Sequence, residues 1–247
     1  MDDPDFLIYD EDRISREDTR AKCVTWFLAG VGIGILSTLW VTDASAQEGT
    51  VDNAVIFLAD VSSSMSGNEV ELVRSAHASA ISSPEVITAI EAGANQRSAF
   101  AYIEFASNAE VIVDWTIIET TADAVNFGTA IMQERPSLGT QTAMGAALVL
   151  AEGLIRSMPF DAMFVTVDVA GDGQNNSGIR TEVPRGMILA SGATINGMPM
   201  PLSSDSRNLV DWYDQNVVGG PRHFNLPLES IADMPMALRR KLIMELF

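Results

Sequence analysis

Apolar residues along the chain form two kinds of pattern that alternate from residue 54 onward. Continuous apolar runs at Ala54–Ala59 and Ala162–Ala170 are typical of strands that are buried on both faces of a sheet. Apolar residues at helical spacing dominate Asn68–Ser82 and Ala143–Met158. This alternation predicts a doubly wound α/β fold, in which a mostly parallel sheet carries helices on both faces.

The remaining segments complete the predicted order of elements. We expect further strands at Ser98–Phe105, Glu110–Ile117 and Ala193–Met198, and further helices at Pro84–Ala92, Ala122–Glu134, Thr181–Ser191, Arg207–Val217 and Leu228–Phe247. Only four residues join the first two of these strands, which predicts a hairpin and therefore one antiparallel edge strand. His223–Leu226 is a candidate for a second edge strand, and Arg239 to Lys241 suit the carboxyl-terminal part of the last helix.

Composition narrows the class of protein. Of the 247 residues, 47% are hydrophobic and 19% are charged, which is typical of a globular domain. The formal net charge is −18, and residues 47–247 carry −13 of it, from 24 acidic and 11 basic side chains. This charge argues against binding to nucleic acid or to an anionic membrane surface.

Cysteine and histidine are too scarce for several kinds of site. Cys23 is the single cysteine, so a disulfide framework is excluded. The two histidines, His77 and His223, are too few for a three-histidine zinc site and leave few ways to form a Ser-His-Asp triad. Because His77 falls on or near the apolar side of a predicted helix, we interpret it as a packed or partly exposed residue rather than a ligand.

The amino-terminal segment has the character of an export signal. Val24–Thr42 holds no charge, follows Arg20 and Lys22, and is followed by Ala44-Ser45-Ala46. We therefore predict a leader at residues 1–46, with cleavage after Ala46, and one domain at residues 47–247. The apolar run is also long enough to span a bilayer, so an uncleaved inner-membrane anchor at residues 24–42 is the alternative. Either interpretation places the domain outside the cytoplasm, in the periplasm or secreted.

Polar side chains cluster where two buried strands end and where one helix begins. Asp60, Ser62 and Ser64 stand at every second position directly after the first strand. Asp172 follows a later strand in Gly171-Asp172-Gly173. Ligands of doubly wound sheets bind beyond the carboxyl ends of the strands, so these two acids can meet there. Thr140 and Thr142 precede a helix. Their hydroxyls, like the carboxylates, are oxygen donors that suit Mg²⁺, Mn²⁺ or Ca²⁺.

Each of these polar segments also has a purely structural explanation. Serine and threonine before a helix are ordinary caps, and Asp-Gly is an ordinary turn. Ser66 is best explained in this way, and Ser63 is out of phase with Asp60. Asp168 lies inside a buried strand, where a paired or edge-facing carboxylate is the simpler interpretation and a supporting role toward the site is the alternative. The coincidence of three loops at one sheet end favours a metal site over three unrelated caps.

The order D-x-S-x-S, then a threonine at a helix start, then D-G after an apolar strand, resembles the von Willebrand factor A (VWA) domain. The resemblance runs from about Asp52 to the last residue. Segments such as VSSSMSG, TAMGAAL and VDVAGDGQNN resemble more closely still a bacterial exported group of these domains, DUF1194. The resemblance implies a Rossmann-like sheet and a metal-ion-dependent adhesion site.

The resemblance also implies roles for individual residues. Ser62 and Ser64 would bind the metal directly, and Asp60 and Asp172 would hold it largely through waters and hydrogen bonds. Thr142 is the expected threonine ligand, with Thr140 as the alternative because the pair stands in T-Q-T. An open coordination position would then accept a carboxylate from a partner protein.

Three functions remain open from the sequence. The first is an exported, non-enzymatic module that binds an acidic residue of a protein partner through Mg²⁺, Mn²⁺ or Ca²⁺. The second is a metal-assisted hydrolase, although no general base is recognisable beside the site and no G-x-S-x-G turn is present. The third is a structural component of the cell envelope whose metal site is vestigial.

Overall fold

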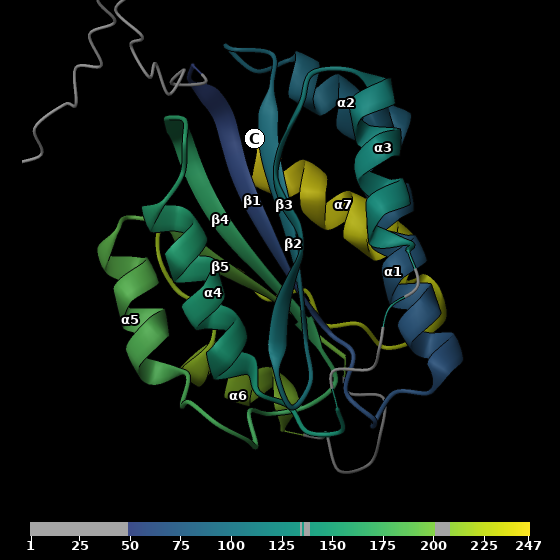
Figure 1. Cartoon of the computed structure of the whole chain (residues 1–247), viewed down its shortest axis with the longest axis vertical. Helices are drawn as coiled ribbons and strands as arrows, with labels where there is room; N and C mark the ends of the chain where they lie inside the picture. Colours follow the sequence, from purple (N-terminus) through teal and green to yellow (C-terminus); the bar gives the residue numbers. More distant parts are fainter. Residues whose placement is uncertain (1–48, 134, 136–138, 201–207) are drawn as a thin grey trace, which may run out of the picture. The chain divides into compact units, whose positions relative to one another are not determined.

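The computed structural model describes residues 49–133, 135, 139–200 and 208–247. Its centre is a five-stranded sheet with the order β3-β2-β1-β4-β5 (Figure 1). The strands are β1 Val51–Asp60, β2 Ser98–Phe105, β3 Ala109–Ile118, β4 Ala162–Gly171 and β5 Thr194–Pro199. All neighbouring pairs are parallel except β2 and β3, which are antiparallel. The predicted α/β class, with one antiparallel edge strand, is therefore confirmed.

Helices cover both faces of the sheet (Figure 1). Helices α1, α2, α3 and α7 share one apolar cluster with one face, and α4, α5 and α6 share a second cluster with the other. The helices are α1 Gly67–Ile81, α2 Pro84–Glu91, α3 Thr121–Ile131, α4 Met144–Arg156, α5 Glu182–Ala190, α6 Leu209–Asn216 and α7 Met234–Leu246, and the 3₁₀ helix η2 Ile231–Asp233 precedes α7.

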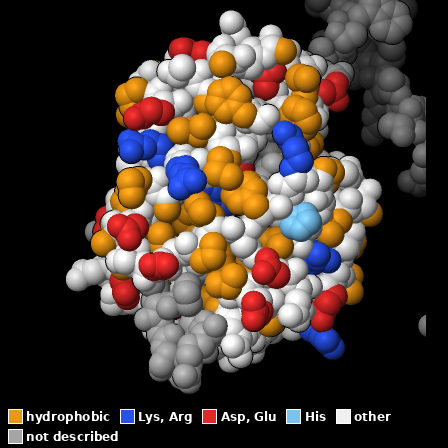
Figure 2. Space-filling model, turned by 180° about the vertical axis from the view of Figure 1, so that it is seen from behind, with side chains coloured by type: hydrophobic (Ala, Val, Ile, Leu, Met, Phe, Trp, Pro, Cys, Tyr) orange, Lys and Arg blue, Asp and Glu red, His pale blue; other side chains and the backbone are white. Residues whose placement is uncertain are grey.

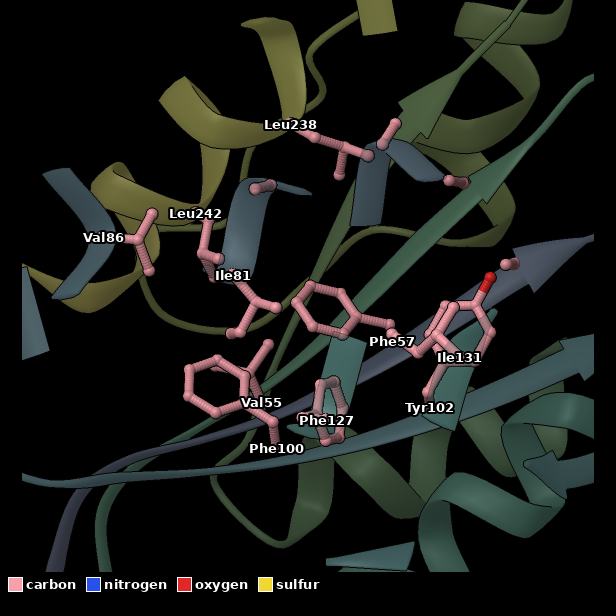
Figure 3. Packing of buried hydrophobic residues seen from close by; sticks show 14 of the residues in the cluster. Val55, Phe57, Ile81, Val86, Phe100, Tyr102, Phe127, Ile131, Leu238 and Leu242 are labelled. Carbon is pink, nitrogen blue, oxygen red and sulfur yellow. The ribbon is translucent and has the colours of Figure 1, made fainter. Parts of the chain in front are cut away.

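Aromatic side chains fill the α1–α3 side of the core. Phe57 of β1 stacks on Phe100 of β2, with 6.0 Å between the ring centroids, and Phe127 of α3 lies 6.2 Å from Phe100 (Figure 3). His77 is buried in the same layer, and its ring meets the edges of Phe57 and Tyr102 at 5.2 Å. Its Nδ1 lies 2.8 Å from the carbonyl of Val73, one helical turn earlier. His77 is thus a packed residue.

The strand register aligns the two acidic strand ends. Ala59 pairs with Ala170, so Asp60 lies beside Gly171 and Asp172 comes next. The same ends of parallel strands meet at one edge, where doubly wound sheets bind their ligands.

The first strand is longer than the apolar run predicts, because two buried polar residues at its start form hydrogen bonds with other parts of the fold. Oδ1 of Asp52 accepts hydrogen bonds from the backbone and side-chain nitrogens of Asn95, both at 2.9 Å. The side chain of Asn53 donates to the carbonyl of Leu246 at 3.3 Å. These partners are distant in sequence, so local patterning could not reveal them.

The carboxyl-terminal helix begins later than predicted. A short 3₁₀ turn precedes Met234, and Pro235 falls in the first turn of α7, where its missing N–H costs no hydrogen bond. The expected strand at His223–Leu226 is reduced to an isolated parallel bridge between Asn225 and Gly197 of β5.

One lysine of α7 reaches into the core. Lys241 is fully buried and pairs with Asp168 at 2.6 Å and with Glu245. Burial and the charge of Asp168 raise the pKa of Glu245 to about 7, although Lys241 opposes the shift. Asp168 is therefore a paired carboxylate, which is one of the two forms that its simpler interpretation allowed.

A separate cavity of about 510 Å³ opens at the amino ends of β4 and β5. Phe164 and Met244, each about half exposed, line it, and the guanidinium of Arg222 lies 5.3 Å from the ring centre of Phe164. Figure 2 shows hydrophobic side chains interleaved with basic ones on one face of the molecule. The cavity lies at the opposite end of the sheet from Asp60 and Asp172.

Among the described residues, no helix is both long and apolar enough to cross a membrane. The predicted leader and its apolar run at Val24–Thr42 lie outside these residues, so the leader and the domain boundary stay predictions.

Candidate metal centre

The first loop of the candidate site follows β1 and folds back onto its own aspartate. Oδ1 of Asp60 accepts a 2.9 Å hydrogen bond from the backbone N–H of Ser62. Ser66 then caps α1: its hydroxyl accepts from the N–H of Glu69, and the Glu69 carboxylate accepts from the N–H of Ser66. These turns hold the hydroxyls of Ser62 and Ser64 close to the end of β1.

A chain of side-chain oxygens joins four of the five predicted ligand residues. Oγ of Ser62 lies 3.0 Å from Oγ of Ser64, which donates to Oδ1 of Asp172 at 2.8 Å. Oγ1 of Thr142 donates to Oγ of Ser62 at 3.5 Å. The fifth residue, Asp60, joins through the backbone N–H of Ser62. Three loops that are far apart in sequence therefore meet at the carboxyl end of the sheet.

The two threonines of the second loop differ in environment. Thr142 is buried, and its hydroxyl faces the serines, whereas Thr140 is exposed. Thr140 contributes its backbone instead: its carbonyl accepts from Oγ of Ser63 and its N–H donates to Oγ of Ser107, both at 3.0 Å. The geometry favours Thr142 as the ligand, and the ligand role itself stays a prediction.

Burial disfavours the charged forms of the two carboxylates of the site, Asp60 and Asp172. Asp60 is fully buried, and its Oδ2 has no hydrogen-bond partner among the described residues. Burial raises the pKa of Asp60 from 3.8 to about 7, against hydrogen bonds from Ser62 that lower it, and the nearby Asp172 raises it further. Burial also raises the pKa of Asp172. Such a carboxylate is unfavourable unless a proton or a cation neutralises it.

The donor set fits a hard divalent cation. Two carboxylates and three hydroxyls supply only oxygen, which Mg²⁺, Mn²⁺ and Ca²⁺ prefer. Within the described part of the chain, no group of three or more His, Cys, Asp or Glu side chains could hold a metal. The candidate centre thus depends on serine and threonine hydroxyls.

Sequence reasoning missed several residues that join the three loops. Oγ of Ser107 accepts from the N–H groups of Thr140 and Gln141, both at 3.0 Å. Gly139 has φ +111°, and a Cβ there would lie 2.4 Å from the same oxygen, so only glycine allows this approach. That glycine is the one signal in the sequence for the contact. Asn175 and Asn176, which follow Gly171-Asp172-Gly173, also bridge two loops.

A buried ion cluster links β2, α1 and Arg135, which precedes the second loop. Glu104 pairs in register with Ala59, close to the end of β2. Its carboxylate accepts from Arg74 of α1 at 2.8 and 3.0 Å, and from Nε of Arg135, just before the second loop, at 2.8 Å. Two guanidinium groups therefore satisfy one buried carboxylate and tie α1 to the segment that leads to Thr142.

Comparison with solved structures defines the class of this fold. The structure is similar to the von Willebrand factor type A protein of Catenulispora acidiphila, with 15% identity, a TM-score of 0.57, and coverage of 79% of this chain and 43% of that chain. It is also similar to the von Willebrand factor domain of the pilus tip protein Mfa5 from Porphyromonas gingivalis, with 12% identity, a TM-score of 0.55, and coverage of 78% and 94%. The fold is therefore that of a VWA domain.

A third similar structure is that of proximal thread matrix protein 1 from the mussel byssus, in a form whose MIDAS motif is occupied by zinc. The identity is 18% and the TM-score 0.55, over 78% of this chain and 46% of that one. The chain thus spans less than half of the mussel and Catenulispora proteins. None of the curated proteins compared with the sequence matches it.

A family model described as "Protein of unknown function (DUF1194)" matches residues 50–247. The chain belongs to this family, as the sequence motifs predicted.

Proposed function

We propose that this protein is an exported, divalent-cation-dependent binding module that captures an acidic residue of a partner protein. Asp60, Ser62, Ser64, Thr142 and Asp172 hold the cation. The observation that carries the proposal is the buried carboxylate of Asp60, whose Oδ2 has no hydrogen-bond partner among the described residues and whose Oδ1 joins the loop of Ser62 and Ser64. The similarity to VWA domains, one of which holds zinc in its MIDAS motif, supports it.

The hydroxyl and carboxylate side chains have different roles toward the cation. The hydroxyls of Ser62, Ser64 and Thr142 bind the cation as neutral donors, and the carboxylates of Asp60 and Asp172 supply negative charge around it. When bound, the cation is an electrophilic centre that attracts a carboxylate. Mg²⁺ suits such a site because it keeps several waters rather than requiring a complete protein cage.

The partner is a protein that offers an aspartate or glutamate side chain. Pilus and byssus proteins among the similar structures favour a role outside the cytoplasm. The apolar segment at residues 24–42 and the Ala-Ser-Ala ending at Ala46 favour export to the periplasm or the medium. The net charge of −18 does not favour nucleic acid as a partner.

A hydrolase is less well supported than a binding module. His77 is packed in the core against Phe57 and Tyr102. Nδ1 of His223 lies 2.7 Å from the carbonyl of Gly220, in the segment that follows α6. No observation on the described residues assigns a general base to the metal centre, so we propose no catalytic step.

A pull-down from envelope extract tests the proposal. The wild-type chain and Ser64→Ala serve as baits, each with Mg²⁺ and with a chelator, and Ser79→Ala is the control because Ser79 is exposed on α1. We expect a protein that the wild type and Ser79→Ala retain only with Mg²⁺, and that Ser64→Ala loses. Retention that is the same with chelator would contradict metal-dependent capture.

A further inference from the structure

Two consecutive asparagines lie in the third loop of the site, which follows β4 and holds Asp172. Both accept hydrogen bonds from backbone N–H groups at or just before the start of α4. Oδ1 of Asn176 accepts from the N–H of Thr142 at 2.8 Å. Oδ1 of Asn175 accepts from the N–H of Gly145 at 2.9 Å. These asparagines follow Asp172 by three and four positions. The loop that contains Asp172 is therefore hydrogen-bonded to the segment that contains Thr142.

Helix α4 lacks a cap of its own. Ala143 occupies its N-cap position and has no side chain that can accept a hydrogen bond. The first N–H groups of a helix need acceptors from elsewhere. Asn175 supplies one to Gly145, and the carbonyl of Ala106 supplies another to the N–H of Ala143 at 2.7 Å. The start of α4 is thus defined by side chains and backbone from other loops.

Asn176 holds Thr142 on both sides of its backbone. Its Oδ1 accepts from the N–H of Thr142, and its own N–H donates to the carbonyl of Thr142 at 3.0 Å. Threonine is β-branched, so once its backbone is fixed, few χ1 positions remain for its hydroxyl. Fixing this backbone therefore fixes where Oγ1 of Thr142 points.

The third loop also approaches α4 more closely than most residues allow. A Cβ on Gly145 would lie 1.9 Å from the carbonyl oxygen of Ile179. Nδ2 of Asn175 donates to that same oxygen at 3.1 Å. Asn175 therefore bridges the helix start and the far side of its own loop, and this contact maintains the loop in the shape that presents Asn176 to Thr142.

From these contacts we propose that Asn175 and Asn176 are positioning residues of the metal centre, which hold Thr142 in place relative to Asp172. The inference rests on the proposed function, because it presumes a cation between these loops. The two asparagines act on the cation through Thr142. The expected size of such an effect is the 10- to 100-fold loss of affinity that is typical when outer-shell partners of a metal site are removed.

Calorimetric titration of the full chain with Mg²⁺ and Mn²⁺ tests the proposal. We expect Asn176→Ala to weaken binding by about 10- to 100-fold. Asn176→Asp keeps an acceptor oxygen for the N–H of Thr142, so we expect its affinity to stay within a few-fold of wild type. Gln174→Ala is the matched control, since Gln174 is exposed in the same loop and forms no hydrogen bond among the described residues; its affinity should not change.

A second readout separates positioning from general stability. The increase in unfolding midpoint caused by Mg²⁺ should shrink in Asn176→Ala and recover in Asn176→Asp. If Asn176→Ala does not fold, Asn176→Gln carries the same expectation, because its amide oxygen is displaced by one bond. Wild-type affinity in a folded Asn176→Ala, or equal weakness of the Ala and Asp variants, overturns the inference. Absence of metal binding by the wild type overturns the proposed function itself.

Discussion

The hydroxyl of Ser64 donates a 2.8 Å hydrogen bond to Oδ1 of Asp172, a residue 108 positions further along the chain. This contact closes the site, because Ser64 belongs to the loop after β1 and Asp172 follows β4. Both side chains carry oxygen atoms of the kind that bind divalent cations. The site is therefore assembled by the pairing of parallel strands rather than by one local motif.

Replacement of Asp60 should separate binding from stability. Asn at position 60 keeps an oxygen that can accept from the N–H of Ser62, yet it removes a charge that is fully buried. We expect Asp60→Asn to lose Mg²⁺ binding while its metal-free unfolding free energy at about pH 8 stays equal to that of the wild type or rises. Chemical denaturation and calorimetric titration measure the two effects. Loss of the fold would argue that the carboxylate is structural.

A methyl group on Gly171 should disturb the site from within the sheet. Its Cβ would lie 2.9 Å from the Tyr213 hydroxyl and 3.0 Å from Oδ2 of Asp60. We expect Gly171→Ala to cost about 1–3 kcal/mol of unfolding free energy and to weaken metal binding. Gly153→Ala is the control, because a Cβ in that part of α4 meets nothing within 4 Å. Alanine there should stabilise the protein by roughly 0.5–1 kcal/mol. Equal effects of the two variants would refute the steric account.

Removal of the buried charge of Glu104 should destabilise the protein strongly. In Glu104→Gln the guanidinium groups of Arg74 and Arg135 lose the carboxylate that pairs with them. Breaking a buried pair in this way typically costs about 3–5 kcal/mol. Denaturant unfolding measures this cost, and replacement of the exposed Glu71 by Gln provides the baseline. A change as small as that of Glu71→Gln would mean that the cluster does not stabilise the fold.

Glu245 should make stability depend on pH. Its pKa is raised from 4.5 to about 7 by burial and by Asp168 of β4, while Lys241 of α7 and Asn196 of β5 oppose the shift. The folded state thus binds this proton more tightly than the unfolded state. Its contribution to stability is complete below the unfolded pKa and is lost as the pH rises through about 7.

We therefore expect the unfolding free energy to fall less in Glu245→Gln than in the wild type when the pH is raised from about 5 to about 8. The difference should be on the order of 3 kcal/mol. Asp60 and His77 are present in both proteins. The raised pKa of Asp60 and the pKa of His77, which burial lowers, therefore do not account for a difference between the two slopes. Identical slopes in denaturant unfolding across this range would contradict the assignment to Glu245.

The amino-terminal prediction is tested by the mature protein. If the leader is cleaved after Ala46, intact-mass measurement of the exported protein should give a chain that begins at Gln47. An anchor at residues 24–42 instead predicts a full-length chain in the membrane fraction. A full-length chain in the soluble cytoplasmic fraction would contradict both interpretations.

Apolar runs predicted most of the sheet, because strands buried on both faces leave a continuous hydrophobic signal. The proximity of Asp60 and Asp172 followed from the same reasoning, since parallel strands end at a common edge. The resemblance to VWA domains added the roles of the individual donors, and the fold and family that it implied are confirmed. The individual metal ligands stay predictions.

Features that depend on distant partners escaped prediction. Lys241 resembled a cation at the end of a helix, whereas it is buried against Asp168, and α7 extends beyond it. The sequence favoured Thr142 over Thr140, but it did not reveal the contacts with Ser107 and Asn176, on other loops, that give the two threonines different environments. Such contacts are set by tertiary packing, so no periodicity in the sequence reports them.

Calorimetric titration of the wild-type chain with Mg²⁺, beside Ser64→Ala and Ser79→Ala, shows whether the carboxyl end of the sheet binds a metal ion. We expect one saturable site in the wild type and in Ser79→Ala, and a clear loss of affinity in Ser64→Ala with little change in the unfolding midpoint measured without metal. No binding by the wild type, or equal binding by Ser64→Ala, would contradict a metal centre at this end of the sheet.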